Sequence, residues 1–245
     1  MSMSDPVNSG SEPSAVDMSA NHEAVKSSAT ELAYEWIKRS IITDLLHAGQ
    51  KVDEKRIATV LGCSRTPVRE ALQRLGSEGF VETSPRRGIS VRALSLADLN
   101  DLYVVATALE TMAVRLIAAR KPGRQELAAL YGACDQMEQA LEMKDAAAWT
   151  DADESFHRAL LVTSDNVRLA QAGILHRELA QRAHFIADRA RAGSNKKKST
   201  LIHRQLVQLL EAGDIEAAVD NHARQRENGS KILLGAIERI GLRSF

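Results

Sequence analysis

Residues 56–75 read RIATVLGCSRTPVREALQRL, and this stretch decides the fold of the N-terminal part of the chain. The spacing predicts two short helices that meet across a tight turn at Gly62-Cys63. Ser64 can cap the second helix, and Pro67 suits its first turn. Apolar residues then repeat at i, i+3, i+4 and i+7, namely Val68, Ala71, Leu72 and Leu75. The pattern indicates a helix-turn-helix.

The flanking sequence extends this motif on both sides. A helical apolar stripe begins at about Thr30, before the motif. After it, residues 80–83 and 89–91 flank the turn 84–88, which is typical of a small β-hairpin. We therefore predict a winged helix-turn-helix domain over 26–92. Residues 1–25 lack an apolar period, and we expect them to be a disordered tail.

The charge distribution agrees with a nucleic-acid partner for this domain. The chain has 32 basic and 32 acidic residues, but residues 26–92 hold 12 basic and eight acidic ones. Opposite the apolar stripe, the second helix presents Arg65, Thr66, Arg69 and Gln73. Arginine can bind guanine or a phosphate through two hydrogen bonds, and Arg86 and Arg87 in the wing can reach an adjacent minor groove or the DNA backbone.

From residue 93 to 245 the pattern is entirely helical. Ser95 and Asp98 form a predicted capping box, and no strand-like alternation follows. We predict helices over 95–120, 124–143, 146–164, 167–192, 198–211 and 215–240. The fold class is therefore mainly α, with an N-terminal winged helix-turn-helix and a C-terminal all-α bundle of about 150 residues.

Several histidines in this second domain are candidate metal ligands. Asp153 and His157 are spaced i, i+4 on one helix face, and His203 and His222 follow on later helices. One carboxylate with two or three imidazoles suits zinc, nickel or manganese. The alternative is a set of surface or hydrogen-bonded core histidines. We interpret Lys196-Lys197-Lys198 as a solvated loop.

The segment LGCSRTPVREALQRLGSEGFVETSPRRGISV, residues 61–91, resembles the DNA-binding module of the GntR regulators. The helical remainder resembles the FCD effector domain of their FadR subfamily. The resemblance implies a homodimer that binds a palindromic double-stranded DNA operator, with the recognition helix in the major groove and the wing at the minor groove. It assigns DNA contacts to the following residues: Lys55, Ser64, Arg65, Thr66, Arg69 and Gly88.

DESFHRAL, residues 153–160, and IHRQLVQLLEAGDIEAA, residues 202–218, resemble the metal-binding segments of FCD domains. Asp153, His157 and His203 fall on three of the four ligand positions that the resemblance implies. The fourth aligns with Gln225, so either His222 substitutes, or Gln225 or a water fills the position, or the site is weak.

The resemblance also implies a small-molecule effector, with an organic acid as the expected class. Ala106 stands where many members carry an arginine on the first helix of the effector domain that helps bind a carboxylate. Other residues that can face the effector pocket lie on the helix expected over 167–192, namely Arg182, His184 and Arg189.

Composition narrows the classes of protein. The chain has two cysteines, too few for a disulfide framework, and no apolar run approaches the roughly 20 residues that cross a bilayer. We expect a cytoplasmic protein with no membrane partner. The leading hypothesis is a ligand-responsive transcriptional regulator that is not an enzyme, and we expect a repressor. The alternatives are a metal-dependent enzyme that uses Asp153, His157 and His203, and an effector-independent DNA-binding protein.

Overall fold

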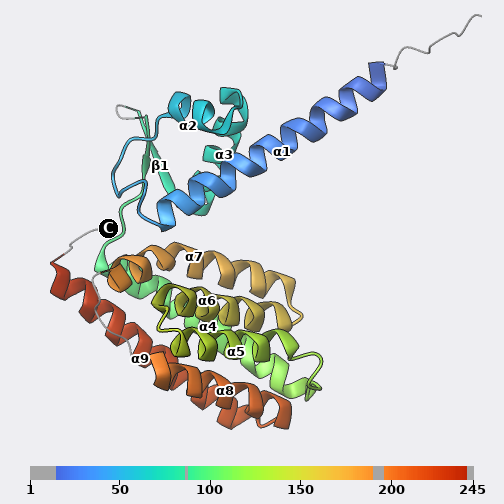
Figure 1. Cartoon of the computed structure of the whole chain (residues 1–245), viewed down its shortest axis with the longest axis vertical. Coiled ribbons are helices and arrows are strands. Elements are labelled where there is room, and N and C mark those ends of the chain that lie inside the picture. The colour runs from blue at the N-terminus through green and yellow to red at the C-terminus, as the bar shows by residue number, and fades with distance from the viewer. Residues whose placement is uncertain (1–14, 86–87, 190–195, 242–245) are drawn as a thin grey trace, which may run out of the picture.

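The computed structural model describes residues 15–85, 88–189 and 196–241 and shows a small N-terminal domain beside a larger helical domain (Figure 1). The mainly α fold class predicted from the sequence is confirmed. Arg86 and Arg87, predicted to lie in the wing, are outside the described residues.

Three helices form the core of the N-terminal domain. Helix α1 (Ala15–Ile42) packs against α3 (Arg65–Glu78), and α2 (Glu54–Leu61) precedes α3. The buried side chains that join them include Ile37, Ile41, Val68, Leu72 and Leu75. Helix α1 begins at Ala15, so residues 15–25 are helical and the expected disordered tail is wrong for them. Alanines at positions 15, 20 and 24 favour a helix without producing an apolar stripe.

The caps of α2 and α3 define the turn between them. Asp53 accepts hydrogen bonds from the backbone of the first turn of α2, and Gly62 ends this helix with φ 63°. A residue with a side chain rarely adopts this left-handed conformation, so glycine favours the sharp turn. Ser64 occupies the N-cap position of α3 with an extended backbone, but its side chain makes no capping hydrogen bond, contrary to our expectation.

The predicted hairpin is confirmed. Strands β1 (Val81–Ser84) and β2 (Gly88–Val91) pair antiparallel, with Val81 opposite Val91 and Ser84 opposite Gly88. Gly88 has φ 75°, which requires the conformational freedom of glycine. The hairpin buries Val81 and Val91 in the core of the domain, so the wing has a fixed position beside α3.

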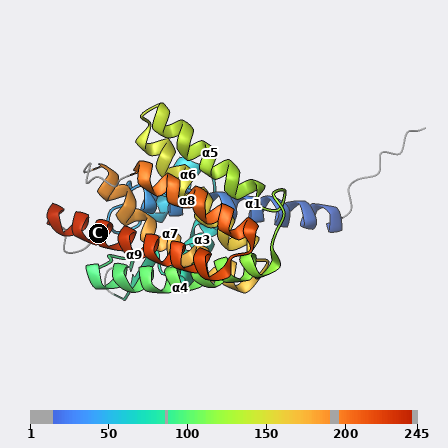
Figure 2. The ribbon, with the colours of Figure 1, turned by 90° about the horizontal axis from the view of Figure 1, so that it is seen from below.

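Within the described residues, the second domain has six helices: α4 (Leu96–Arg120), α5 (Ala128–Glu142), α6 (Ala146–Thr163), α7 (Val167–Arg189), α8 (Lys196–Ala212) and α9 (Ile215–Ile240). Seen from below, α4 and α5 lie on opposite sides of the domain, with α6, α7 and α8 between them (Figure 2). The largest hydrophobic core joins α4, α5, α6 and α8 around Phe156, Leu130, Met137 and Leu206. The predicted capping box of Ser95 and Asp98 begins α4.

Helix α4 is long and apolar enough to span a membrane by length and composition, with a mean hydropathy of 1.6 over its best window. We expected no apolar run that approaches the length needed to cross a bilayer, and the apolar character of this helix, which charged residues interrupt, was not predicted. In the fold, α4 contacts α6, α7, α8 and α9, and its buried residues include Leu99, Val114 and Ile117. Its composition therefore agrees with a helix that packs against several neighbours in the domain.

Candidate functional site

The exposed face of α3 carries the residues predicted to contact DNA. Ser64, Arg65, Thr66 and Arg69 are exposed, as are Lys55 on α2 and Gly88 in the wing. The opposite face of α3 is buried, so the helix presents its polar side to solvent as the sequence pattern indicated.

Glu54 holds both arginines of this face, and the sequence analysis did not identify it. Its Oε2 accepts hydrogen bonds from Arg65 Nη2 at 3.1 Å and from Arg69 Nε at 2.8 Å. Partial burial acts to raise the pKa of Glu54, but hydrogen bonds from Arg69 and Arg65 lower this pKa below its usual range. The carboxylate therefore stays ionised and orients the two guanidinium groups.

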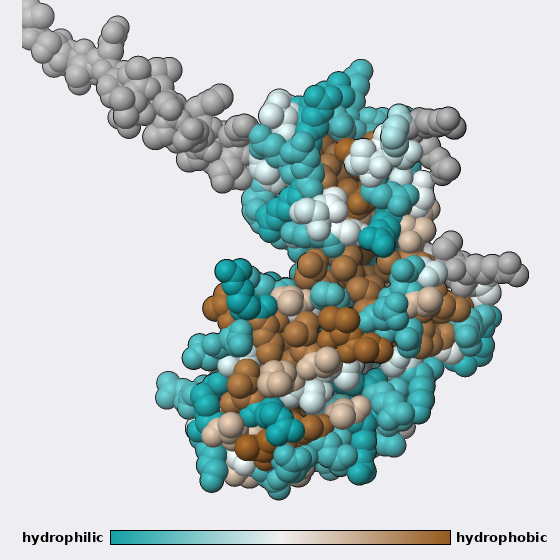
Figure 3. Space-filling view, turned by 180° about the vertical axis from the view of Figure 1, so that it is seen from behind, coloured by the Kyte–Doolittle hydropathy of each residue, from teal (hydrophilic) through white to brown (hydrophobic). Residues whose placement is uncertain are grey.

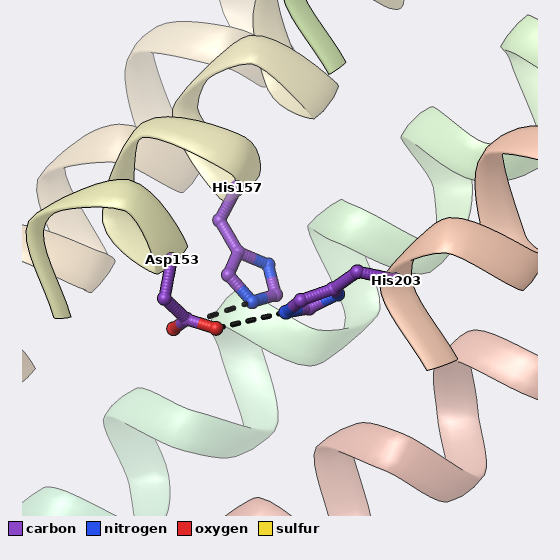
Figure 4. A group of neighbouring side chains, drawn as sticks. All are labelled: Asp153, His157 and His203. Carbon is purple, nitrogen blue, oxygen red and sulfur yellow. Dashed lines mark hydrogen bonds and ion pairs between the residues drawn. The ribbon is translucent and has the colours of Figure 1, made fainter. Parts of the chain in front are cut away.

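Three of the predicted metal ligands meet inside the helical domain. Asp153 and His157 extend from α6 toward His203 of α8 (Figure 4). One ligand atom from each residue lies within 4.8 Å of the other two, and His203 Nε2 is 2.8 Å from Asp153 Oδ1. Phe156 stacks on His203 with ring centroids 4.2 Å apart, which fixes the imidazole.

The two candidates for a fourth ligand have different surroundings. Gln225 Nε2 lies 3.1 Å from each ring nitrogen of His203, and the side-chain oxygen of Gln225 is buried without a hydrogen-bond partner among the described residues. His222 is fully buried, and its Nε2 is 3.1 Å from Glu110 Oε2. Gln225 therefore adjoins the Asp153, His157 and His203 group directly, whereas His222 contacts a carboxylate behind it.

Glu110 lies at the centre of a buried ionic network behind the three ligands. The side chain of Glu110 is fully buried on α4 and accepts a 2.7 Å hydrogen bond from Arg177 Nη1. Arg226 Nε lies 3.1 Å from Glu110, and His157 Nδ1 lies 3.3 Å from it. Arg177 also donates hydrogen bonds to Glu154. Glu110 is the one charged residue of the stretch 102–114, and this position was a signal in the sequence that could have indicated the network.

The environment prepares these groups to bind a cation. Burial lowers the pKa of His157 to about 3, so its imidazole is neutral at pH 7. Burial acts to raise the pKa of Asp153, but the hydrogen bond and charge of His203 hold it below the usual range. The ionised Asp153 and the neutral His157 are in the forms that bind a metal ion. The donor set and the unpartnered Gln225 oxygen fit a divalent cation.

A cavity of about 430 Å³ opens beside the three candidate ligands. Its lining residues include Tyr103, Trp149, Asp153, His157, His184, Lys196, Lys198, Gln225, Arg226, Ile232, Leu233 and Ala236. A volume of this size suits a small organic molecule. The wall combines polar groups near Asp153 with apolar side chains on α9.

The residues predicted to face an effector separate into three cases. His184 lines the cavity, and its Nε2 is 2.5 Å from the Tyr103 hydroxyl. Arg182 instead lies at the contact with the N-terminal domain, where it pairs with Asp44, so its assignment to this cavity is wrong. Two residues along a helix turn the side chain by about 200°, which explains the separation from His184. The side chain of Arg189 is outside the described part of the structure.

The lysine run 196–198 is not a loop, contrary to expectation. It forms the first turn of α8, and Lys196 and Lys198 line the cavity. The Lys196 ammonium donates a hydrogen bond to the Thr150 hydroxyl at 2.9 Å and lies 4.4 Å from the centre of the Trp149 ring. These contacts hold a positive charge at the cavity wall.

A winged helix-turn-helix joined to a helical domain with a polar cavity defines a DNA-binding regulator. Residues 29–91 match the family described as "Bacterial regulatory proteins, gntR family", and residues 101–224 match the FCD domain. The chain belongs to the GntR family of transcriptional regulators and has an FCD effector domain.

Known relatives agree with this assignment. The chain is 32% identical to a probable D-xylose utilization operon transcriptional repressor of Paenarthrobacter nicotinovorans, over 75% of this chain and 79% of that protein. It is 42% identical to an uncharacterized HTH-type transcriptional regulator of Agrobacterium vitis, over 53% of this chain and 77% of the relative. The structure of McbR/YncC from E. coli has the same fold, with a TM-score of 0.71, 24% identity and coverage of 84% and 96%.

Proposed function

We propose that this regulator binds a palindromic DNA operator as a homodimer and that a small organic acid in the helical domain changes its affinity for the operator. The main support for this proposal is the cavity of about 430 Å³ beside the group of Asp153, His157 and His203. The same chain exposes Arg65 and Arg69 on α3. We expect the protein to act in the cytoplasm as a repressor.

An exposed apolar face on α4 supports a dimer. Val104 is 62% exposed, Val105 is 40% exposed and Met112 is 47% exposed. The view from behind shows hydrophobic side chains gathered over the helical domain, on the side where α4 lies (Figure 3). Two recognition helices on a symmetric dimer would contact two half-sites of a palindrome.

Operator contacts in this proposal come from Lys55, Ser64, Arg65, Thr66 and Arg69, with Gly88 at the wing. Both arginines are exposed and already oriented by Glu54. On binding, they would exchange this carboxylate for a base edge or a phosphate, which are the acceptors that a guanidinium binds best in DNA. Arg86 and Arg87 are proposed to contact the DNA backbone or minor groove from the wing.

Asp153, His157 and His203 would hold a divalent ion such as zinc, nickel or manganese, with Gln225 beside them. Such an ion would carry a positive charge, and a carboxylate oxygen of the effector would complete its coordination shell. His222 would act from behind through Glu110 rather than as a ligand. His184 and Lys196 would give the cavity further groups that favour an anion.

The test begins with the selection of operator DNA from a random pool by the purified full-length chain. Fluorescence anisotropy then measures the affinity for that operator, with and without a panel of small carboxylates, while sedimentation measures the mass of the complex. We expect a palindromic site, two chains per site and a change in affinity with at least one carboxylate. A response to none of them would favour the effector-independent alternative, and a single chain per site would contradict the dimer.

A further inference from the structure

Arg226 on α9 is a buried guanidinium at the edge of the cavity. The residue is 7% exposed, lines the cavity, and sits with its Nε 3.1 Å from Glu110 Oε2. Its guanidinium carbon lies 4.6 Å from the centre of the Tyr103 ring. Arg226 donates no hydrogen bond to any of the described residues, and its buried Nε contacts Glu110 as an ion pair only. The donors of a fixed, buried arginine are therefore available to a ligand.

Two neighbouring groups hold Arg226 in this position. Glu110 neutralises part of its charge and is itself held by Arg177. Tyr103 supports the flat face of the guanidinium, and its hydroxyl meets His184 of α7. The Tyr103 ring and the charge of Glu110 hold this arginine, although its Nε makes no hydrogen bond, and the guanidinium presents its donors as a planar fork that matches the two oxygens of a carboxylate.

Arg226 is also close to the candidate metal ligands. It follows Gln225 in the sequence, and Glu110 contacts both Arg226 and His157. An anion bound to the fork would therefore lie next to the group of Asp153, His157 and His203. Burial favours an anion over a neutral ligand at this position, because a neutral ligand gives the donors of Arg226 no charged acceptor.

The position differs from the one that the family resemblance implies. Ala106 of α4 occupies the place of the expected arginine, and this residue is 2% exposed and carries only a methyl group. Tyr103, one turn earlier on α4, instead supports an arginine that comes from α9. The arginine that lines the cavity thus comes from α9, whereas the resemblance places an arginine on α4.

The rest of the cavity wall defines the other end of the ligand. Beyond Arg226, α9 contributes Ile232, Leu233 and Ala236, and α7 contributes Ala187. Ten residues of helix separate Arg226 from Ala236, which corresponds to about 15 Å. Asn228 and Lys231 of α9 and Lys196 and Lys198 of α8 also line the cavity, so these four apolar side chains form one part of a mixed wall.

We propose that Arg226 is the anion-binding and specificity-determining residue of this cavity. It binds the carboxylate of an effector whose apolar part lies along α9 against Ile232 and Leu233. This inference rests on the proposed function, since it names the ligand class of the same cavity. The carboxylate completes the hydrogen bonds of Nη1 and Nη2, and the apolar side chains of α9 contact the hydrocarbon part of the ligand.

Calorimetric titration of the full-length protein tests the inference directly. The probes are butanoate, hexanoate, octanoate and benzoate, with hexanamide as the neutral match of hexanoate, each measured after EDTA treatment and again with zinc added. We expect at least one monoanion to bind and hexanamide to bind at least tenfold more weakly than hexanoate. Arg226→Gln should weaken the best monoanion by roughly 10- to 100-fold.

Two further variants keep the test decisive. Arg226→Lys retains the charge but loses the fork, so we expect an intermediate loss of affinity with the fold intact. Arg224→Gln, two residues away on the exposed side of α9, is the matched control and should leave affinity unchanged. If hexanamide binds as well as hexanoate, if Arg226→Lys and Arg226→Gln bind as wild type, or if no monoanion binds in either preparation, the inference is wrong.

A different result is expected if the proposed function is wrong and the inference about Arg226 is right. The monoanion then binds and Arg226→Lys weakens its binding, but the same ligand does not change the operator affinity measured by anisotropy. Failure of the inference instead removes the dependence on Arg226, whether or not another ligand changes operator affinity. The two measurements therefore separate the identity of the anion-binding residue from the regulatory role of the cavity.

Discussion

Arg182 of the helical domain and Asp44 of the N-terminal domain form an ion pair, with Arg182 Nη2 2.5 Å from Asp44 Oδ1. Arg182 is 4% exposed, so the pair is partly shielded from solvent. His184, two residues along α7, lines the cavity, while Leu175 and Leu179 of α7 pack against the core of the N-terminal domain. One helix thus contacts both the cavity and the DNA-binding domain, which makes α7 a physical link between them.

Asp44→Asn should destabilise the protein by about 1 to 3 kcal/mol, because it leaves the buried guanidinium of Arg182 without its charged acceptor. Nε and Nη1 of Arg182 already lack hydrogen-bond partners among the described residues. Urea unfolding of the full chain measures the loss as a shift of the midpoint. Asp151→Asn, at an exposed position of α6, is the control and should leave the midpoint in place.

A double-mutant cycle shows whether the two residues act as a pair. Arg182→Gln alone should cost a similar amount, and the double variant should cost clearly less than the two single losses added together. Additive losses would mean that the ion pair between the domains contributes nothing to stability, and α7 would then be connected to the N-terminal domain by apolar packing alone.

Arg65→Ala and Arg69→Ala should each weaken operator binding by about 1 to 3 kcal/mol, because each removes a guanidinium from the exposed face of α3. Loss of Arg65 should also relax the sequence preference. Anisotropy titrations with the selected operator and with a scrambled duplex measure both effects. Arg115→Ala is the control, since this exposed arginine of α4 pairs with Glu216 far from α3.

Unchanged binding curves for both variants would refute the assignment of α3 to base recognition. The partner Glu54 makes the outcome more informative, because removal of one arginine leaves the other still held by the same carboxylate. We expect the Arg65 variant to lose sequence preference as well as affinity, even where the two variants lose similar affinity.

Local patterns predicted the architecture well because they depend on neighbouring residues. The apolar spacing of Val68, Ala71, Leu72 and Leu75 identified the buried side of α3, and the capping box of Ser95 and Asp98 identified the start of α4. Asp153, His157 and His203 were found by spacing on α6 and by family resemblance, and the structure brings them together.

The sequence did not indicate features that depend on contacts between distant helices. Glu110 on α4 meets Arg177 on α7 and Arg226 on α9, and no local pattern connects those three positions. Arg182 and His184 looked equivalent in the sequence, but the helix turns them toward different partners. Lys196 was read as part of a loop because its preceding Gly193-Ser194 suggested a break, whereas Trp149 and Thr150 of α6 hold it.

Gln225→His should increase the affinity for zinc by at least about tenfold, because it adds an imidazole beside His203 to complete four protein ligands. His203→Ala should abolish stoichiometric binding, because His203 belongs to the three-residue group. Elemental analysis of untagged protein after dialysis measures the metal content, and competition with a chelator measures the affinity.

His176→Ala is the matched control for these histidine variants. His176 lies on α7, where its Nδ1 meets the carbonyl oxygen of Ala172, and it is not part of the candidate group. Metal content should be unchanged in this variant. Equal metal content in wild type and His203→Ala would contradict a site at these residues, and an unchanged affinity in Gln225→His would place the fourth ligand elsewhere.

Asp98→Asn should destabilise the protein by about 0.5 to 1 kcal/mol at pH 7, because the carboxylate caps the start of α4 and its charge is favoured there. Hydrogen bonds from the hydroxyl and backbone N–H of Ser95 lower the pKa of Asp98 below the usual range. The folded state thus binds this proton less readily than the unfolded chain, whose aspartate pKa is about 3.9. The stabilisation is therefore complete above that pKa and is lost as the pH falls through the lower folded value.

Urea unfolding at a series of pH values from 7 down to 3.5 measures this dependence as the difference in midpoint between wild type and Asp98→Asn. The difference should be constant at pH 5 to 7 and should shrink below pH 4, because protonated aspartate resembles asparagine in charge. Asp101→Asn, at an exposed position in the same part of α4, is the matched control and should show a smaller difference at pH 7. A difference for Asp98→Asn that persists unchanged to pH 3.5 would mean that the capping box acts through hydrogen-bond geometry, and that the charge of Asp98 contributes nothing to the stability of α4.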